Sequence, residues 1–271
     1  MNTTLYPSCS LVITTYNWPS ALNLVLQSVS NQTLSPQQIL IADDGSGSDT
    51  EQLISSWKDK LPQLTHCWQQ DLGFRAAQSR NNALAKVQSD YVILIDGDMI
   101  LKPHFIEDHL KFSKVGSFVQ GRRAKLTPSA TEKLLKLDNW QWDAKQLANC
   151  VTAAHKLKRN AMLSKFLGYK QHNAKDIRSC NMGFWMDDLK AVNGFDSDYI
   201  GWGREDSDLG WRLINNNIAK RHLRYKAVAL HLHHKEDSRE FLAENDARLK
   251  RTINDNTYTY CLNGLAQINN Q

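Results

Sequence analysis

The sequence predicts an α/β fold with a mainly parallel sheet flanked by helices, and three observations support this prediction. Short apolar runs alternate with segments of helical periodicity through the first third of the chain. Residues 91–95 are apolar throughout, which is typical of a strand buried on both faces of a parallel sheet. Pairs of carboxylates directly follow two of the runs, and open α/β sheets bind ligands at these carboxyl ends of their strands.

The N-terminal elements follow from the spacing of apolar residues and from the polar breaks between them. We expect strands at residues 10–15, 38–42, 64–68 and 91–95. Helices should lie between these strands: one after Pro19 and ending near residue 30, one carrying Trp57, and one over residues 73–87. Because short connections join each strand to the next helix, the strands should be parallel, with right-handed crossovers.

The pattern changes after Pro103. The sequence predicts a helix at residues 105–112, a brief strand at residues 117–120 and largely helical structure from residue 129 to about residue 169. Residues 180–186 should re-enter the sheet, a helix should begin at residue 205, and residues 225–230 should form an edge strand. Beyond residue 235 we expect a charged, weakly periodic helix and a polar tail without recognisable chemistry.

The overall composition is that of an ordinary globular protein. With 41% hydrophobic and 23% charged residues, the chain can form a proper core, and a net charge of +5 permits an anionic partner without requiring one. No run of apolar residues is long enough to cross a membrane, and no secretion leader is visible. The five cysteines are scattered and include no Cys-x-x-Cys, so we expect a cytoplasmic protein with reduced thiols.

A basic stretch lies between residues 145 and 178, which contain eight Lys or Arg and one acid, Asp176. The simpler interpretation is a solvated helical face. The alternative is a surface that meets an anionic acceptor or the headgroups on the inner face of the cytoplasmic membrane. Basic residues alone do not separate the two, so a peripheral membrane contact stays open.

Carboxylates follow the second and the fourth predicted strands. Asp43 and Asp44 end the second, and Asp96 and Asp98 end the fourth. Parallel strands place their carboxyl ends on one edge of the sheet, so the two pairs should converge over one crevice. Carboxylate oxygens suit Mn²⁺ or Mg²⁺ carrying a phosphorylated substrate. The alternative for each pair is a turn or a helix cap.

Arg75 and Arg80 begin the helix between these strands, and together with the carboxylates they suggest a nucleotide site in which arginines meet phosphate. Neither a Gly-x-Gly-x-x-Gly fingerprint nor a P-loop occurs in the chain. Without such a loop, a metal ion must neutralise the phosphate.

A second group of acids follows a tryptophan. Trp202 lies between Gly201 and Gly203, and Glu205 and Asp206 open the next predicted helix. The helix dipole accounts for one or two acids in a first turn, but not for the indole that precedes them. Glycines let the backbone approach a ligand closely, and an exposed indole is a flat platform for a sugar ring. A carboxylate beside that platform can act as general base toward a hydroxyl.

Three histidines, His231, His233 and His234, end the last predicted strand. They form either a polar strand end or part of a metal site. On a strand, His231 and His233 would share a face while His234 points away. One imidazole joining carboxylates and a diphosphate is a reasonable manganese set.

Taken in order, these motifs resemble a known family. Residues 12–17, 41–46, 80–83 and 96–98 resemble the four successive signatures of family-2 inverting glycosyltransferases with the GT-A fold. Residues 194–196 and 201–206 resemble the acceptor-side motif of β-1,4-galactosyltransferases and bacterial chondroitin-type polymerases. The resemblance implies a Rossmann-like sheet with a helical insertion and a C-terminal acceptor-binding lobe. It divides one continuous domain into a nucleotide-sugar-binding half at residues 1–123, a helical basic insertion at 124–178, and an acceptor-binding and catalytic half at 179–271.

The resemblance also implies roles on the nucleotide side, residue by residue. Thr14 and Tyr16 would line the nucleotide pocket. Asp44 would accept from a base N–H, and Arg75 would lie near the base or the diphosphate. Asp96 would face the ribose.

On the metal and acceptor side, Asp98 would bind the metal, Mn²⁺ or Mg²⁺, together with His231, although the other two histidines leave that ligand open. Asp206 would be the catalytic base, while Glu205 and Trp202 would hold the acceptor sugar.

The function that follows from the resemblance is metal-dependent, inverting and non-processive transfer of one hexosyl or N-acetylhexosaminyl unit. The donor would be a nucleotide-sugar, with UDP favoured by the family, and the acceptor a glycan or glycolipid in bacterial surface polysaccharide or lipopolysaccharide synthesis. The Gln-x-x-Arg-Trp motif of processive synthases is absent. The alternative is a catalytically inactive sugar- or nucleotide-binding module with the same fold. No basic-aromatic pattern typical of nucleic-acid binders occurs, and residues 11–19 lack the glycines that a nucleotidyltransferase would need.

Overall fold

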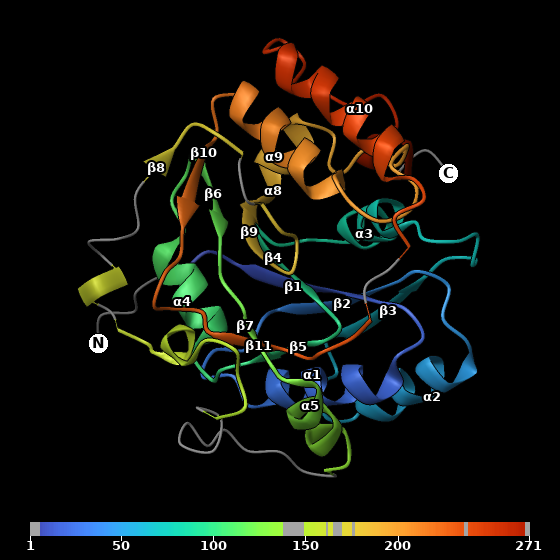
Figure 1. The fold of residues 1–271 in the computed structure, drawn as a ribbon, viewed down its shortest axis with the longest axis vertical. Helices are drawn as coiled ribbons and strands as arrows, with labels where there is room; N and C mark the ends of the chain where they lie inside the picture. Colours follow the sequence, from blue (N-terminus) through green and yellow to red (C-terminus); the bar gives the residue numbers. More distant parts are fainter. Residues whose placement is uncertain are drawn as a thin grey trace.

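The structure is a computed structural model that describes residues 6–137, 149–160, 162–164, 170–174, 177–235 and 238–268. A large sheet runs through the centre, and a small second sheet lies beside it (Figure 1). The strands of the large sheet are β1 (Cys9–Thr15), β2 (Gln38–Asp43), β3 (Leu64–Trp68), β4 (Tyr91–Asp96), β6 (Ser117–Gln120), β8 (Lys170–Gln171), β9 (Asn181–Trp185) and β10 (Ala219–His222). The strands of the small sheet are β5 (Met99–Leu101), β7 (Ala124–Lys125) and β11 (Ala229–His231).

Helices cover both faces of the large sheet (Figure 1). The helical elements of the described residues are α1 (Pro19–Ser30), α2 (Ser48–Trp57), α3 (Ala76–Leu84), α4 (Phe105–Phe112), α5 (Pro128–Leu135), α8 (Met186–Ala191), α9 (Glu205–Asn215), α10 (Leu242–Asn254), α11 (Leu265–Ile268) and the 3₁₀ turn η1 (Ala154–Leu157). No helix among the described residues is long and apolar enough to cross a membrane.

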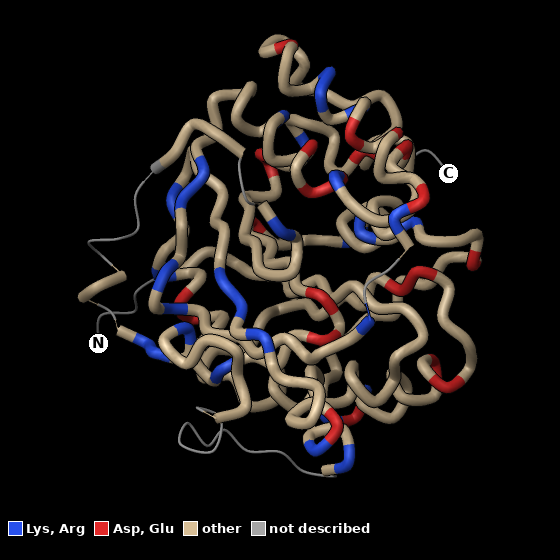
Figure 2. Tube along the Cα trace, viewed as in Figure 1, with Lys and Arg blue, Asp and Glu red and all other residues tan. Residues whose placement is uncertain are grey.

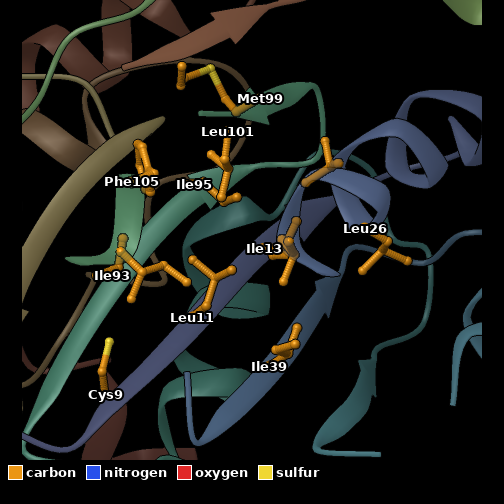
Figure 3. Packing of buried hydrophobic residues seen from close by; sticks show 14 of the residues in the cluster. Cys9, Leu11, Ile13, Leu26, Ile39, Ile93, Ile95, Met99, Leu101 and Phe105 are labelled. Carbon is orange, nitrogen blue, oxygen red and sulfur yellow. The ribbon is translucent and has the colours of Figure 1, made fainter. Parts of the chain in front are cut away.

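The N-terminal half has the predicted parallel order. Neighbouring strands run β3-β2-β1-β4, and all three of these pairings are parallel. Side chains alternate along β4, so that Ile93 and Ile95 pack with α1 and α2 while Val92 and Leu94 face the side of α3 and α9. Figure 3 shows Ile93 and Ile95 beside Leu11 of β1. A strand that is apolar on both faces is therefore buried on both faces, as its sequence predicts.

The second half of the sheet is mixed. β9 pairs antiparallel with both β4 and β6, whereas β10 pairs parallel with β6. β10 was not predicted, because Ala-Lys-Arg-His shows neither an apolar run nor alternation. The expected strand at residues 225–230 is shorter than predicted: Tyr225 (φ 59°) and Ala227 (φ 42°) are left-handed, and only Ala229–His231 is strand.

The expected helical stretch from residue 129 to residue 169 is described only in part. Its described helical elements include α5, which Pro128 begins and the Thr127 side chain caps at the backbone N–H of Ala130, and η1. Residues 138–148 and 165–169 lie outside the described residues, as do Lys145, Lys165 and Lys175 of the basic stretch.

The turn after β4 links the two sheets. It also positions the rim, the edge of the large sheet where β1, β2 and β4 have their carboxyl ends. The backbone N–H of Gly97 donates to the carbonyl of Thr14 at 2.7 Å, and a Cβ on Gly97 would lie 3.0 Å from that same oxygen. The chain then enters β5, whose Met99 pairs with His231 of β11. This register places Asp98 beside His231.

Candidate active site

The carboxyl ends of β1, β2 and β4 form the rim where the predicted donor residues meet. Thr14 of β1 is in register with Ala42 on one side and Asp96 on the other. Asp44 follows β2 directly, and its backbone N–H donates to the carbonyl of Thr15. Figure 2 shows acidic segments at the ends of β2 and β4 and at the start of α9 around the middle of the molecule.

The two aspartates after β2 have different environments. Asp43 is fully buried and accepts from the backbone N–H of Ser46 and from His66 Nε2 at 2.8 Å, which outweighs burial and lowers its pKa. Asp44 accepts from the backbone N–H of Arg75 at 2.8 Å, and burial raises its pKa to about 6 despite that bond. Asp43 therefore stabilises the loop after β2, while the pKa of Asp44 lies close to neutral pH.

Tyr16 and Arg75 lie at the same end of the rim as Asp44. The Tyr16 side chain is 51% exposed, and its hydroxyl donates to Asp71 at 2.9 Å. Arg75 Nη1 lies 3.5 Å from Gln78 Oε1. A flat exposed ring, a guanidinium and a carboxylate are thus available for a base and its sugar.

Arg80 of α3 connects the rim to the second acidic group. Its guanidinium donates through Nε to Thr14 Oγ1 at 3.1 Å and through Nη1 to Glu205 at 2.9 Å, and its Nη2 lies 3.4 Å from Asp96. The side chain is buried, and its face lies over the Phe195 ring. In this structure Arg80 is thus paired with two carboxylates and a hydroxyl, and its contact with phosphate stays a prediction.

Asp98 lies between two imidazoles. Its Oδ2 is 3.3 Å from His231 Nε2 and 3.3 Å from His234 Nε2, and one ligand atom from each of the three residues lies within 4.8 Å of the others. Burial and then the charge of Arg123 lower the pKa of His231 to about 2, so its imidazole is neutral and can act as a ligand. Two imidazoles and a carboxylate fit a divalent transition ion such as Mn²⁺.

The structure corrects the strand geometry expected for the histidines. β11 ends at His231, and the following residues are not strand, so alternation does not apply to them. His233 is exposed, and its backbone N–H donates to Thr131 Oγ1. His234 instead turns toward Asp98, so it is the second imidazole of the group and His233 is outside it.

The loop before α9 presents Trp202. Gly201 (φ +72°), Gly203 (φ +101°) and Arg204 (φ +84°) are all left-handed, and the indole between the glycines is 38% exposed. A Cβ on Gly201 would lie 2.5 Å from the ring of Phe241, so this glycine permits close packing against the C-terminal segment.

The C-terminal segment holds this loop in place, a role that no sequence motif predicted. Asn245 of α10 is buried, and its side-chain amide donates to the carbonyls of Ile200 and Gly203, each at 3.0 Å. Arg204 pairs with Asp246 of α10 at 2.5 Å. Because Asn245 lies on an otherwise ordinary charged helix, nothing in its pattern distinguishes it from a solvated residue.

Glu205 and Asp206 lie in the first turn of α9. Asp206 accepts from the backbone N–H of Ser179 at 3.1 Å and from the Ser207 hydroxyl at 3.2 Å. Burial, together with the charge of Glu205, raises the pKa of Asp206 to about 7. A carboxylate with a pKa near neutrality suits a general base.

Arg80 links the candidate metal site (Asp98, His231 and His234) to the acid pair of α9. Its guanidinium pairs with Glu205 on one side and with Asp96, two residues before Asp98, on the other. The structure thus brings the predicted carboxylates to one region of the rim. Asp96 is not among the three candidate metal ligands and instead faces Arg80.

Comparison with known proteins agrees with this geometry. The mainly parallel sheet with carboxylates on its rim is a GT-A type fold. The chain belongs to glycosyl transferase family 2, whose model matches residues 10–175. Residues 160–235 match a second model, described as the N-terminal domain of galactosyltransferase. The resemblance inferred from the motifs is therefore confirmed.

Curated relatives are similar over most of this chain. Validoxylamine A glucosyltransferase of Streptomyces hygroscopicus subsp. limoneus is 25% identical over 78% of this chain and 49% of its own length. Chondroitin synthase of Escherichia coli is 25% identical over 75% of this chain and 32% of its own length. The chain therefore spans about half, or less, of the length of these relatives.

Solved structures share the fold. The crystal structure of S. aureus TarS 1-349 in complex with UDP has a TM-score of 0.62 at 15% identity, covering 96% of this chain and 68% of that one. A mannosyltransferase from Pyrobaculum calidifontis in complex with GDP-Man and Mn²⁺ has a TM-score of 0.59 at 17% identity, covering 93% and 66% of the two chains.

Proposed function

We propose that this chain is a metal-dependent inverting glycosyltransferase that moves one sugar from a UDP-sugar to a glycan or glycolipid acceptor. The observation that carries the proposal is Arg80, which joins Thr14 and Asp96 at the rim to Glu205 of α9. Donor-side groups and acceptor-side carboxylates thus share one buried guanidinium. Family membership supports sugar transfer, and the UDP and Mn²⁺ complexes of the structural neighbours support the donor and the ion.

On the donor side, Asp44 would accept from a base N–H, with Tyr16 and Arg75 beside the base and Thr14 lining the pocket. Asp96 would face the ribose with the part of its carboxylate that Arg80 does not cover, since its side chain is 30% exposed. Asp98, His231 and His234 would hold Mn²⁺ or Mg²⁺, which would supply positive charge to the diphosphate.

On the acceptor side, Trp202 and Glu205 would hold a sugar, and Asp206 would act as the base. Asp206 removes the proton from the attacking hydroxyl, and the hydroxyl oxygen forms a bond to the anomeric carbon. The bond from that carbon to the phosphate oxygen breaks, and its electron pair leaves with the diphosphate. Attack from the opposite face inverts the carbon, so an α-linked donor gives a β-linked product.

The acceptor would be a glycan or glycolipid of bacterial surface polysaccharide or lipopolysaccharide, assembled at the inner face of the cytoplasmic membrane. The exposed indole of Trp202 supports a sugar acceptor. The basic residues near η1, including Lys156 and Lys158, support contact with an anionic acceptor or surface.

The decisive experiment measures donor turnover. UDP-sugars are incubated with Mn²⁺, and release of UDP is followed for the wild type and for Asp206→Asn. Asp187→Asn, at an exposed residue of α8, is the matched control. We expect Asp206→Asn to lower turnover by about 100- to 10,000-fold, the range typical for loss of a general base, while UDP still binds. Asp187→Asn should match the wild type.

Two outcomes would oppose the proposal. Turnover in Asp206→Asn equal to that of the wild type would exclude Asp206 as the base. Nucleotide binding without turnover of any UDP-sugar in the wild type would favour the alternative, a binding module that retains the fold without catalysis.

A further inference from the structure

A second positive group beside the metal ion would help to hold the diphosphate of the proposed donor, and Arg80 is already paired with two carboxylates. The three guanidinium nitrogens of Arg80 are engaged by Thr14, Glu205 and Asp96. Arg75 is anchored beside Asp44, at the other end of the rim, through its backbone N–H. A free guanidinium near the metal candidate would therefore have to come from elsewhere in the fold.

The segment between β6 and β7 brings such a group to the rim. Its path is fixed at Gly121, whose N–H donates to the carbonyl of Asn181 at 2.8 Å and whose Cβ, if present, would lie 2.2 Å from the Asn181 side chain. Asn181 Nδ2 in turn donates to the carbonyl of Arg122 at 2.8 Å. Arg123 follows, directly before β7, and β7 pairs with β11 so that Lys125 is opposite His231. Figure 2 shows basic residues along this segment.

The register of the small sheet places the backbone of Arg123 beside the candidate metal site. Arg123 directly precedes β7, in which Ala124 is opposite Leu230 and Lys125 is opposite His231. Arg123 therefore lies two residues before the position that faces His231.

The hydrogen bonding of Arg123 is incomplete. Its Nε–H is buried and has no acceptor, and no hydrogen bond or ion pair of its guanidinium is found within the described part of the chain. A buried donor without an acceptor is unfavourable until a ligand supplies one. Arg80, with every nitrogen engaged, and Arg123, with none, thus differ in what they can offer to an incoming anion.

We propose that Arg123 binds the diphosphate of the nucleotide donor and stabilises the charge on the departing phosphate oxygen. This inference rests on the proposed function. The planar guanidinium matches phosphate oxygens with paired N–H donors, and it retains its charge throughout the reaction. As the bond from the anomeric carbon to oxygen breaks, the electron pair moves onto an oxygen that Arg123 can reach from the side of β7.

The test compares two adjacent arginines. Binding of UDP and of uridine is measured by calorimetry with Mn²⁺ present, for the wild type, Arg123→Gln and Arg122→Gln. Arg122 undergoes the same change of charge, but it lines a separate small cavity with Lys158 and Tyr225. We expect Arg123→Gln to weaken UDP binding by about 10- to 100-fold and to leave uridine binding unchanged, because only the charge-assisted bonds to phosphate are lost. Arg122→Gln should match the wild type, and Arg123→Lys should recover part of the affinity.

The outcomes separate this inference from the function on which it rests. A wild type that binds UDP no better than uridine would overturn the proposed donor and Arg123 with it. A wild type that binds UDP, together with Arg123→Gln that binds UDP equally well, would overturn only the role of Arg123. Equal losses for UDP and uridine, with a lowered melting temperature, would show that Arg123 supports the fold rather than the phosphate.

Discussion

The two sides of the candidate site are built in different ways. On the donor side, Thr14, Asp44 and Asp96 occupy the ends of adjacent parallel strands, so sheet register alone brings them together. On the acceptor side, the loop around Trp202 is held by Asn245 of a later helix and by packing of Gly201 on Phe241. One side depends on regular secondary structure and the other on contacts between distant segments. The two sides should therefore respond differently to substitution.

The largest effect should come from Arg80, which belongs to both sides. Arg80→Met would leave Glu205 buried without its partner, and loss of one member of a buried ion pair costs about 3–5 kcal/mol. Chemical denaturation measures this loss. Lys136→Met, which removes an exposed pair with Glu132 on α5, should cause no measurable change. Similar stability of both variants would mean that Arg80 does not join the two sides.

The metal candidate allows a direct comparison of two neighbouring histidines. His234→Ala should weaken Mn²⁺ binding by at least about 10- to 100-fold, the range known for supporting residues of metal sites, because it removes one of the three candidate ligands. His233→Ala should have no effect, since that side chain lies outside the group. Titration of Mn²⁺ by electron paramagnetic resonance provides the measurement. A larger loss of Mn²⁺ affinity in His233→Ala than in His234→Ala would instead agree with the side-chain alternation of an ideal strand.

The two sides should also titrate separately. Asp206 has a pKa raised to about 7, so below that pH it is protonated and cannot act as a base. Sugar transfer should therefore fall by about tenfold per pH unit below pH 7. Asp44 has a pKa raised to about 6, so UDP binding should weaken only below pH 6, where Asp44 gains a proton. A single midpoint shared by binding and transfer would contradict this division.

The smallest predicted effect concerns Asn245. Asn245→Ala would leave the carbonyls of Ile200 and Gly203 without their buried donor, at a cost of about 1–3 kcal/mol. We expect a higher KM for the acceptor and an unchanged Kd for UDP. Glu244→Ala on the exposed face of the same helix is the control. A loss of UDP affinity in Asn245→Ala would show that the helix supports both sides of the site.

Sequence reasoning succeeded where local pattern determines position. The apolar run of β4 and the parallel order β3-β2-β1-β4 follow from periodicity and short connections, and the carboxylates after the strands follow from that order. It missed β10, whose sequence has no strand pattern. It also did not foresee that Arg80 pairs with Glu205, because local periodicity does not place the two side by side.

Other misses have the same origin. His234 joins the candidate metal site because β11 ends at His231, so that His233 and His234 are not strand and do not alternate. Asn245 and Arg123 gain their positions only when distant strands and helices meet. Spacing along the chain predicts neighbours within an element, but it does not predict which side chains face each other across the finished fold.

The pair between Arg80 and Glu205 joins residues 125 positions apart in the chain. A contact of such long range forms late in folding, because closing a large loop costs conformational entropy before the contact can contribute to stability. During synthesis, the first four strands could assemble while Arg80 still lacks one of its carboxylates. The pairing of Arg80 in the donor pocket would then be complete only after α9 has left the ribosome. Nucleotide binding should therefore indicate that the whole domain has folded.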